Sequence, residues 1–126
     1  MPRHSILING LRLYAYHGVM PQEQKVGAHF TLDLRLDTDF SEAMQTDRLE
    51  GTVSYADVCD VVKQEMAVPS RLLEHAGSRI IEALHRRFPQ VTAIKLRLIK
   101  DNPPMGADLA GAGIEIDERP AAPRHE

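Results

Sequence analysis

A lysine at the end of an alternating apolar run is the first residue of this sequence whose position suggests chemistry. Ile94, Leu96 and Leu98 alternate with other residues, and Lys100 follows with the same parity. If the strand keeps its register, the ammonium group lies at the apolar face, where desolvation lowers the pKa of a lysine and suits it to proton transfer. The simpler alternative is a lysine whose stem covers apolar surface while its charge reaches water.

Two glutamates carry carboxylates that could bind a ligand. Glu74 lies at the start of a predicted helix, where a carboxylate can accept two parallel hydrogen bonds from a flat, amidine-like edge. The helix dipole would also stabilise a charge there without any ligand. Glu23 lies in the segment from Pro21 to Gly27, which we predict to be a polar loop, and its simplest interpretation is a solvated surface residue.

A histidine and a tyrosine complete the candidates. Tyr16-His17-Gly18 predicts an exposed imidazole beside backbone that a ligand can approach closely, and a core or capping histidine is the common alternative. Tyr55 has the helical spacing of a core residue. No paired metal-ligand spacing, Gly-rich phosphate loop or Gly-x-Ser-x-Gly motif is present, so we predict no metal site.

Four predicted strands must position these residues. Strict alternation marks a strand over residues 30–36 with one buried and one wet face. Asn9-Gly10 interrupts an earlier strand and predicts a turn or bulge there. The predicted strands span residues 5–16, 30–36, 93–100 and 114–117.

Two predicted helices lie between the strand pairs. Ser54, with Asp57 three residues later, resembles a capping box before an apolar stripe that ends at Pro69-Ser70. A second stripe runs from Leu73 to Phe88, where Pro89 stops it. The order β-β-α-α-β-β predicts an α+β fold with a four-stranded antiparallel sheet and both helices on one face. Unpaired sheet edges also favour oligomerisation.

The composition excludes several classes of function. The 126 residues are 43% apolar and 26% charged, which fits one domain, expected over residues 1–119, with a disordered tail over 120–126. A net charge of −3 with both signs interspersed offers no surface for nucleic acid or anionic lipid. No apolar run is long enough to span a membrane, and no signal-peptide pattern precedes Gly10. With a single cysteine, Cys59, we expect a cytoplasmic protein.

Five segments, in order along residues 5 to 118, resemble the bacterial dihydroneopterin aldolase family of folate biosynthesis. They are Tyr14-Ala15-Tyr16-His17-Gly18, Glu23 with Gly27, Ser54-Tyr55-Ala56-Asp57, Leu73-Glu74-His75 and Lys100-Asp101-Asn102-Pro103-Pro104. The resemblance implies the tunnelling fold, or T-fold, in which four subunits join their sheets into a barrel and two rings commonly stack into an octamer. Two positions depart from the family, namely Ala15 at a frequent glycine and Ala28 where many members have glutamine.

The resemblance also implies three catalytic residues. Lys100 matches the family's catalytic lysine, and Glu23 matches the acid that orients this lysine and the substrate side chain. Tyr55 matches a tyrosine that reaches the pocket from a neighbouring subunit. The active sites are therefore expected at the interfaces of a homo-oligomer, either a tetramer or an octamer.

A second set of residues is expected to bind the pterin. Glu74 matches the residue that holds the flat amino-pyrimidinone edge, and the backbone of Leu73 adds contacts. Backbone groups near Val19 and Val53 lie where family members touch the ligand, and His17 is also predicted to bind it.

The implied reaction is retro-aldol cleavage of dihydroneopterin to hydroxymethyl-dihydropterin and glycolaldehyde. The substrate's own ring imine can accept the electrons of the broken bond, so the enzyme needs only proton transfer and positioning, and we expect no cofactor. Lys100, through an ordered water, would help to remove the hydroxyl proton, and Tyr55 would help to return a proton to the ring-side carbon. Epimerisation of the side chain follows when glycolaldehyde recombines before leaving.

Three other interpretations stand beside this one. An epimerase dedicated to the triphosphate ranks second, because no phosphate-binding cation besides Lys100 is evident. A non-catalytic pterin- or purine-binding module would keep the role of Glu74 but would not need Lys100 or Tyr55. A structural, ring-forming protein would need none of the three.

Overall fold

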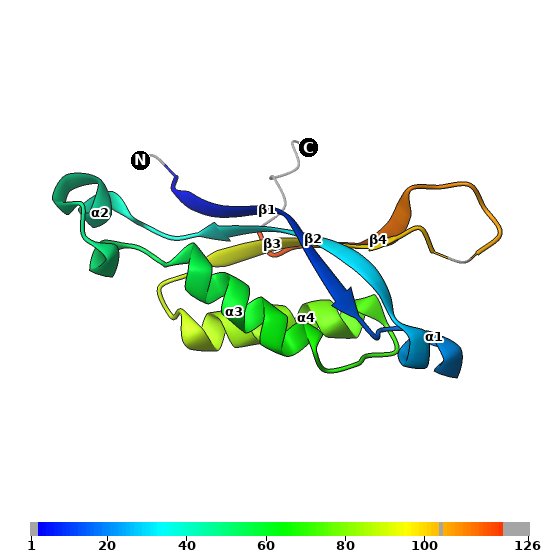
Figure 1. Cartoon of the computed structure of the whole chain (residues 1–126). Coiled ribbons are helices and arrows are strands. Elements are labelled where there is room, and N and C mark those ends of the chain that lie inside the picture. The colour runs from blue at the N-terminus through cyan, green and yellow to red at the C-terminus, as the bar shows by residue number, and fades with distance from the viewer. Residues whose placement is uncertain (1–2, 104, 120–126) are drawn as a thin grey trace, which may run out of the picture.

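The computed structural model describes residues 3–103 and 105–119. Four strands form one antiparallel sheet in the order β1-β2-β3-β4, and the long helices α3 and α4 cover one of its faces (Figure 1). The long elements are β1 (Ser5–Ala15), β2 (Ala28–Asp37), α3 (Tyr55–Met66), α4 (Leu73–Arg87), β3 (Ala93–Asp101) and β4 (Gly111–Asp117). This arrangement confirms the predicted α+β class and the placement of both helices on one face.

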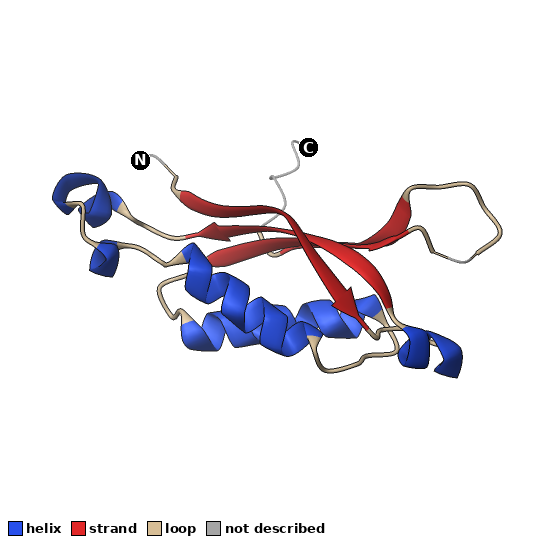
Figure 2. Cartoon of the chain, in the orientation of Figure 1, coloured by secondary structure: helices blue, strands red, loops and turns tan. Residues whose placement is uncertain are grey.

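Three short helices add to the predicted order, as Figure 2 shows. They are α1 (Pro21–Val26), α2 (Ser41–Thr46) and the 3-10 helix η1 (Leu49–Gly51). The prediction of a loop at residues 21–27 was therefore wrong. Pro21 occupies the first helical position, and the carboxylate of Glu23 accepts a hydrogen bond of 3.1 Å from the backbone N–H of Met20. Both features favour a helix start, and Gly27, with φ of 75°, ends the helix.

The predicted irregularity in β1 is a change of register between Ile8 and Leu11. Gly10 adopts a φ of 67° there, and its N–H donates a hydrogen bond of 2.6 Å to Asp33. The change matters because Ile8 and Leu13 have opposite parity, and yet both pack in the core. The bulge therefore keeps both halves of β1 against the helices.

The core lies between the sheet and the two long helices. Every second residue of β2 and β3 points into it, which confirms the alternation predicted for both strands. Ser54 caps α3 by accepting a hydrogen bond of 3.4 Å from Asp57 N–H, as predicted. The most deeply buried side chains include Phe30, Leu32, Leu36, Val58, Val62, Ile80, Leu84, Ile94, Leu96 and Leu98.

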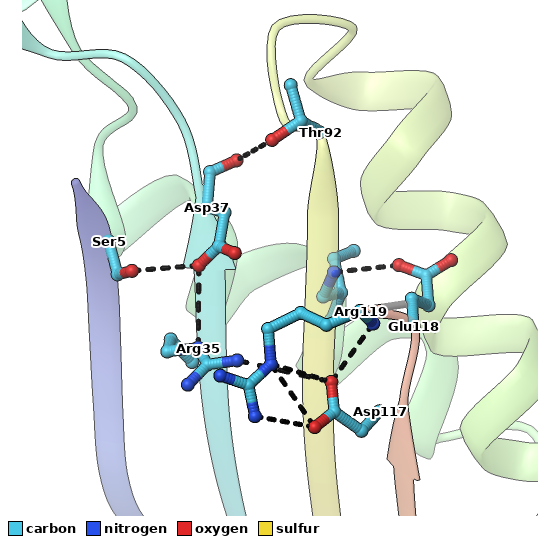
Figure 3. Close-up of polar contacts among 8 residues, drawn as sticks. Ser5, Arg35, Asp37, Thr92, Asp117, Glu118 and Arg119 are labelled. Carbon is cyan, nitrogen blue, oxygen red and sulfur yellow. Dashed lines mark hydrogen bonds and ion pairs between the residues drawn. The ribbon is translucent and has the colours of Figure 1, made fainter. Parts of the chain in front are cut away.

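The other face of the sheet is polar, and ion pairs join its strands at one end (Figure 3). Ser5 of β1 donates a hydrogen bond of 2.8 Å to Asp37 of β2, and Arg35 of β2 lies 4.0 Å from Asp117 of β4. Hydrogen bonds from Arg119 hold the pKa of Asp117 far below its usual range. A lysine on the helix-covered face is therefore in a different environment from these charges.

None of the described helices is both long and apolar enough to cross a membrane. The tail predicted at residues 120–126 lies outside the described residues.

Candidate active site

Lys100 lies on the helix-covered side at the end of β3, as its parity predicts. Its Nζ is 2.5 Å from Oε2 of Glu23, which belongs to α1 and is 77 residues away in the sequence. The side chains of Lys100 and Glu23 are only 12% and 26% exposed. Phe30 is opposite Lys100 in the sheet register, and Nζ lies 6.0 Å from the centroid of its ring. The charge of Lys100 is therefore held by a carboxylate beside an aromatic ring and does not extend into water.

The end of β3 is held in place on both sides of Lys100. Asp101 accepts a hydrogen bond of 3.0 Å from the hydroxyl of Thr31 on β2. Asn102 adopts a φ of 46°, and its N–H donates a hydrogen bond of 2.9 Å to the carbonyl of Ala110. These bonds hold the chain directly after the lysine, where Pro104 lies outside the described residues. A fixed strand end gives Nζ a defined position.

Glu23 is a half-buried ion-pair partner, so the prediction of a solvated surface residue was wrong. The hydrogen bond from Lys100 and a second one from the N–H of Met20 hold the pKa of Glu23 below its usual value. The carboxyl group is consequently ionised at neutral pH. Gly18 is required beside it, because a Cβ at that position would lie 2.3 Å from the Cβ of Glu23.

His17 is 1% exposed, so the expectation of an exposed ring was wrong, and its alternative, a core histidine, is correct. Its Nδ1 accepts a hydrogen bond of 2.9 Å from the backbone N–H of Ser70. Burial, together with the charges of Arg79 and Lys100, lowers the pKa of His17 to about 4. The ring is therefore neutral at pH 7, and its Nε2 is buried without a hydrogen-bond partner among the described residues.

Glu74 lies in the first turn of α4 and is exposed. Within the described part of the chain, its carboxylate makes no hydrogen bond and no ion pair. The next residue, His75, has Nδ1 at 3.1 Å from the hydroxyl of Ser70, and the backbone N–H of Ser70 bonds in turn to His17. The structure thus places Glu74 and Leu73 at the same end of the molecule as Lys100. Val19 lies there too, between His17 and α1, and is half exposed.

Tyr55 and Val53 lie at the opposite end of the long helices. Figure 1 shows α3 and α4 side by side in opposite directions, so the start of α3 is distant from Glu74 at the start of α4. Twelve helical residues span about 18 Å. One chain therefore does not bring Tyr55 together with Lys100.

The predicted core position of Tyr55 was also wrong, because its side chain is 68% exposed. Tyr55 has the angular position of Val58 and Val62 around the helix. It occupies the first turn of α3, however, where residues 55–57 are all exposed, and the buried stripe of this helix begins at Val58. Val53 is 3% exposed, which leaves only its backbone groups as contacts for a ligand.

Two residues that contact Lys100 or His17 were not found from the sequence. Phe30 has the alternation of an ordinary core strand, and Ser70 was interpreted as the end of a helix. These patterns do not reveal that Phe30 lies opposite Lys100 or that Ser70 bonds to His17. The two pairs join residues that are 70 and 53 positions apart in the chain. Residues 3–103 and 105–119 contain no group of three or more His, Cys, Asp or Glu residues arranged to hold a metal ion.

Comparison with known proteins places this chain in a family. The family model "FolB: Dihydroneopterin aldolase" matches residues 6–117. The chain belongs to the dihydroneopterin aldolase family. The dihydroneopterin aldolase of Staphylococcus epidermidis is 39% identical over 112 residues, which cover 88% of this chain and 93% of that protein. The Streptococcus pyogenes serotype M18 enzyme is 36% identical over 115 residues, or 90% and 97% of the two chains.

The fold agrees with that of a solved family member. The crystal structure of Escherichia coli dihydroneopterin aldolase superposes with a TM-score of 0.84 at 23% sequence identity, covering 92% of this chain and 99% of the other. The predicted T-fold is therefore confirmed, as is the resemblance to this family of aldehyde-lyases.

Proposed function

We propose that the chain cleaves dihydroneopterin by a retro-aldol reaction at the site where Lys100 meets Glu23. The observation that carries this proposal is a largely buried lysine in direct contact with an ionised carboxylate, at the strand end where the family has its catalytic lysine. The E. coli relative was crystallised in complex with neopterin, which supports a pterin as the ligand of this fold.

The chemistry requires proton transfers and an electron acceptor. When the carbon–carbon bond of the side chain breaks, the hydroxyl on the leaving carbon becomes the aldehyde of glycolaldehyde and releases its proton. The electron pair of the bond moves into the ring imine, which becomes an enamine. A proton then returns to the ring-side carbon, so that the reaction consumes no net proton. The protein has to move one proton and hold the substrate still.

Lys100 and Glu23 are suited to move that proton. Their contact places an ammonium and a carboxylate within one hydrogen bond, next to the ring of Phe30 and largely out of water. Polar groups in such a site interact more strongly than they would in water. We assign the removal of the hydroxyl proton, through an ordered water, to the neutral amine form of Lys100, because an ammonium group has no lone pair to accept a proton. We assign the orientation of Lys100 and the substrate to Glu23.

Glu74 is suited to bind the pterin ring. Its exposed carboxylate in the first turn of α4 is free to accept two parallel hydrogen bonds from the amino-pyrimidinone edge. We assign further contacts to the backbone at Leu73 and Val19 and, from a neighbouring subunit, to the backbone at Val53. His17 is too deeply buried to contact the pterin directly, and we assign it a supporting role for the residues around the site.

A complete site requires a second subunit in this proposal. Tyr55 is exposed and lies a helix length away from Glu74 in its own chain, so it meets a substrate at Lys100 only from a neighbouring copy. A head-to-tail contact of this kind closes into a ring when the rotation between subunits permits. We propose a tetramer or an octamer, and a cytoplasmic location.

The decisive experiment incubates the purified protein with dihydroneopterin and measures glycolaldehyde and hydroxymethyl-dihydropterin. Formation of both products, with loss of activity in Lys100→Ala, supports the aldolase. Binding of hydroxymethyl-dihydropterin without turnover would indicate a pterin-binding module, and neither binding nor turnover would leave a structural protein. A parallel assay with dihydroneopterin triphosphate, followed by separation of the side-chain epimers, tests the dedicated epimerase.

A further inference from the structure

Ser70 is a buried residue of the turn between α3 and α4 that contacts four other residues through polar atoms. Only 5% of its surface is exposed. Its N–H donates a hydrogen bond of 2.9 Å to Nδ1 of His17, and its carbonyl accepts one of 2.9 Å from Gly18 N–H. Its hydroxyl accepts a hydrogen bond of 2.8 Å from Nη2 of Arg79 and lies 3.1 Å from Nδ1 of His75. The backbone and the side chain of Ser70 therefore serve different neighbours.

The backbone bonds lead to the carboxylate of the ion pair. Gly18 belongs to the segment between β1 and α1, and its backbone lies directly against Glu23, where a Cβ would be 2.3 Å from the Cβ of that residue. Its carbonyl also accepts a hydrogen bond of 3.0 Å from the side-chain amide of Gln24. By holding the backbone of Gly18 in place, Ser70 also fixes the position against which the side chain of Glu23 packs.

The hydroxyl contacts lead to the predicted pterin-binding end of α4. His75 directly follows Glu74 in the first turn of that helix. Arg79, farther along the helix, also donates a hydrogen bond of 2.9 Å to the carbonyl of Glu65 near the end of α3. The hydroxyl of Ser70 thus joins the first turns of α4 to the turn that precedes it.

His17 is the uncharged acceptor of the hydrogen bond from the backbone N–H of Ser70. Because its pKa is lowered to about 4, the ring is neutral at pH 7, and since Nδ1 accepts from Ser70, the proton resides on Nε2. The ring also packs edge-on against Phe30, at 5.4 Å between centroids. Phe30 is the aromatic residue beside Lys100. The contacts of Ser70 and His17 therefore reach both members of the ion pair, Glu23 through Gly18 and Lys100 through Phe30.

We propose that Ser70 is a positioning residue for the aldolase reaction, which sets the separation between Glu74 and the Lys100–Glu23 pair. This inference rests on the proposed function. The pterin ring and its side chain form one covalent unit, so a carboxylate that binds the ring and a lysine that acts on the side chain must lie a fixed distance apart. A displacement of about 1 Å in such a site is expected to cost up to a hundredfold in rate. His17 acts through Ser70 and is a positioning residue as well.

The first test is Ser70→Ala, which removes the two hydroxyl contacts and leaves both backbone bonds. We expect kcat for dihydroneopterin to fall at least fivefold, because Glu74 and Lys100 are no longer held at the required separation, and the Kd for hydroxymethyl-dihydropterin and the KM for dihydroneopterin to rise at least fivefold as well. Ser41→Ala, on the distant helix α2, is the matched control and should change neither. Ser70→Ala with wild-type kcat overturns the inference, whether or not its thermal midpoint is lowered, because the hydroxyl is then at most a stabilising group and does not set that separation.

The second test separates the two nitrogens of His17. In His17→Asn the side-chain oxygen takes the place of Nδ1 and can accept from Ser70 N–H, whereas His17→Leu offers no acceptor. We expect His17→Asn to keep the Kd for hydroxymethyl-dihydropterin within threefold of the wild type and His17→Leu to weaken binding at least tenfold. Equal losses in both variants would overturn the role of His17 as an acceptor for Ser70. Wild-type turnover is measured in the same assay, and its absence would refute the proposed function separately.

Discussion

The contact between Lys100 and Glu23 allows a quantitative prediction about stability. We consider Glu23→Gln, which removes the negative charge but keeps a side-chain oxygen able to accept from the N–H of Met20. The start of α1 is thereby preserved, because glutamine also serves at this capping position. The substitution therefore isolates the interaction of the carboxylate with the ammonium group.

The expected magnitude follows from burial. Hydrogen bonds to charged groups contribute about 1.5 to 3 kcal/mol, and exposed ion pairs contribute less than about 1 kcal/mol. The lysine is 12% exposed and the glutamate 26%, so we compare the pair with hydrogen bonds to charged groups and not with exposed ion pairs. Water that reaches the carboxylate weakens the interaction somewhat. We expect a coupling free energy of about 2 kcal/mol. With a urea dependence of about 2 kcal/mol per M, this corresponds to a shift of about 1 M in the unfolding midpoint.

The assay is a double-mutant cycle of Glu23→Gln and Lys100→Met, followed by urea unfolding at a single protein concentration, because assembly would otherwise alter the apparent stability. Glu42→Gln is the matched control, since Glu42 lies in the first turn of the short helix α2 and is exposed. This control should change the free energy of unfolding by less than about 0.5 kcal/mol.

The coupling also has a predicted pH dependence. The pKa of Glu23 is lower in the folded chain than in the unfolded chain, so its contribution is complete above the unfolded value of about 4.3. The contribution falls as the pH decreases through the folded value. A coupling below about 0.5 kcal/mol at pH 7, or one that grows on acidification, would refute the ion pair as described.

Four further predictions concern the proposed function. Glu74→Gln places a donor against a donor of the pterin, so calorimetric titration with hydroxymethyl-dihydropterin should show affinity at least tenfold weaker; wild-type affinity would contradict the assignment. Lys100→Ala should keep that affinity within a few-fold but turn over about a hundredfold or more slowly, and normal turnover would exclude a catalytic role. Tyr55→Phe and Lys100→Ala, each inactive alone, should regain part of the activity in mixed oligomers, because some interfaces then carry both native residues; no recovery after proven subunit exchange would argue against a shared site. Exhaustive treatment with a chelator should leave turnover unchanged, and a loss restored by a single divalent ion would contradict the predicted metal independence.

The sequence by itself determined the elements and the faces that they bury. Alternation in residues 30–36 and 93–100 is sufficient to predict both strands and the inward direction of Lys100, because side chains of a strand alternate between its faces. The Asn9-Gly10 interruption predicted the bulge, and Ser54 predicted the start of α3. These are local properties, in which residues a few positions apart fix the conformation. The helix α1 was missed although its signals, Pro21 and Glu23, are also local.

Tertiary structure alone decided how those elements meet. No local pattern relates Glu23 to Lys100, His17 to Ser70, or Tyr55 to the edge of the core. The lysine is held by a carboxylate 77 residues away, and the histidine is buried because a turn 53 residues later covers it. Tyr55 has the spacing of a core residue and is exposed, because burial depends on what lies opposite a helix turn and not only on its periodicity. Contacts between distant segments arise from packing, so the sequence could supply the candidate residues while only the folded chain shows which of them come together.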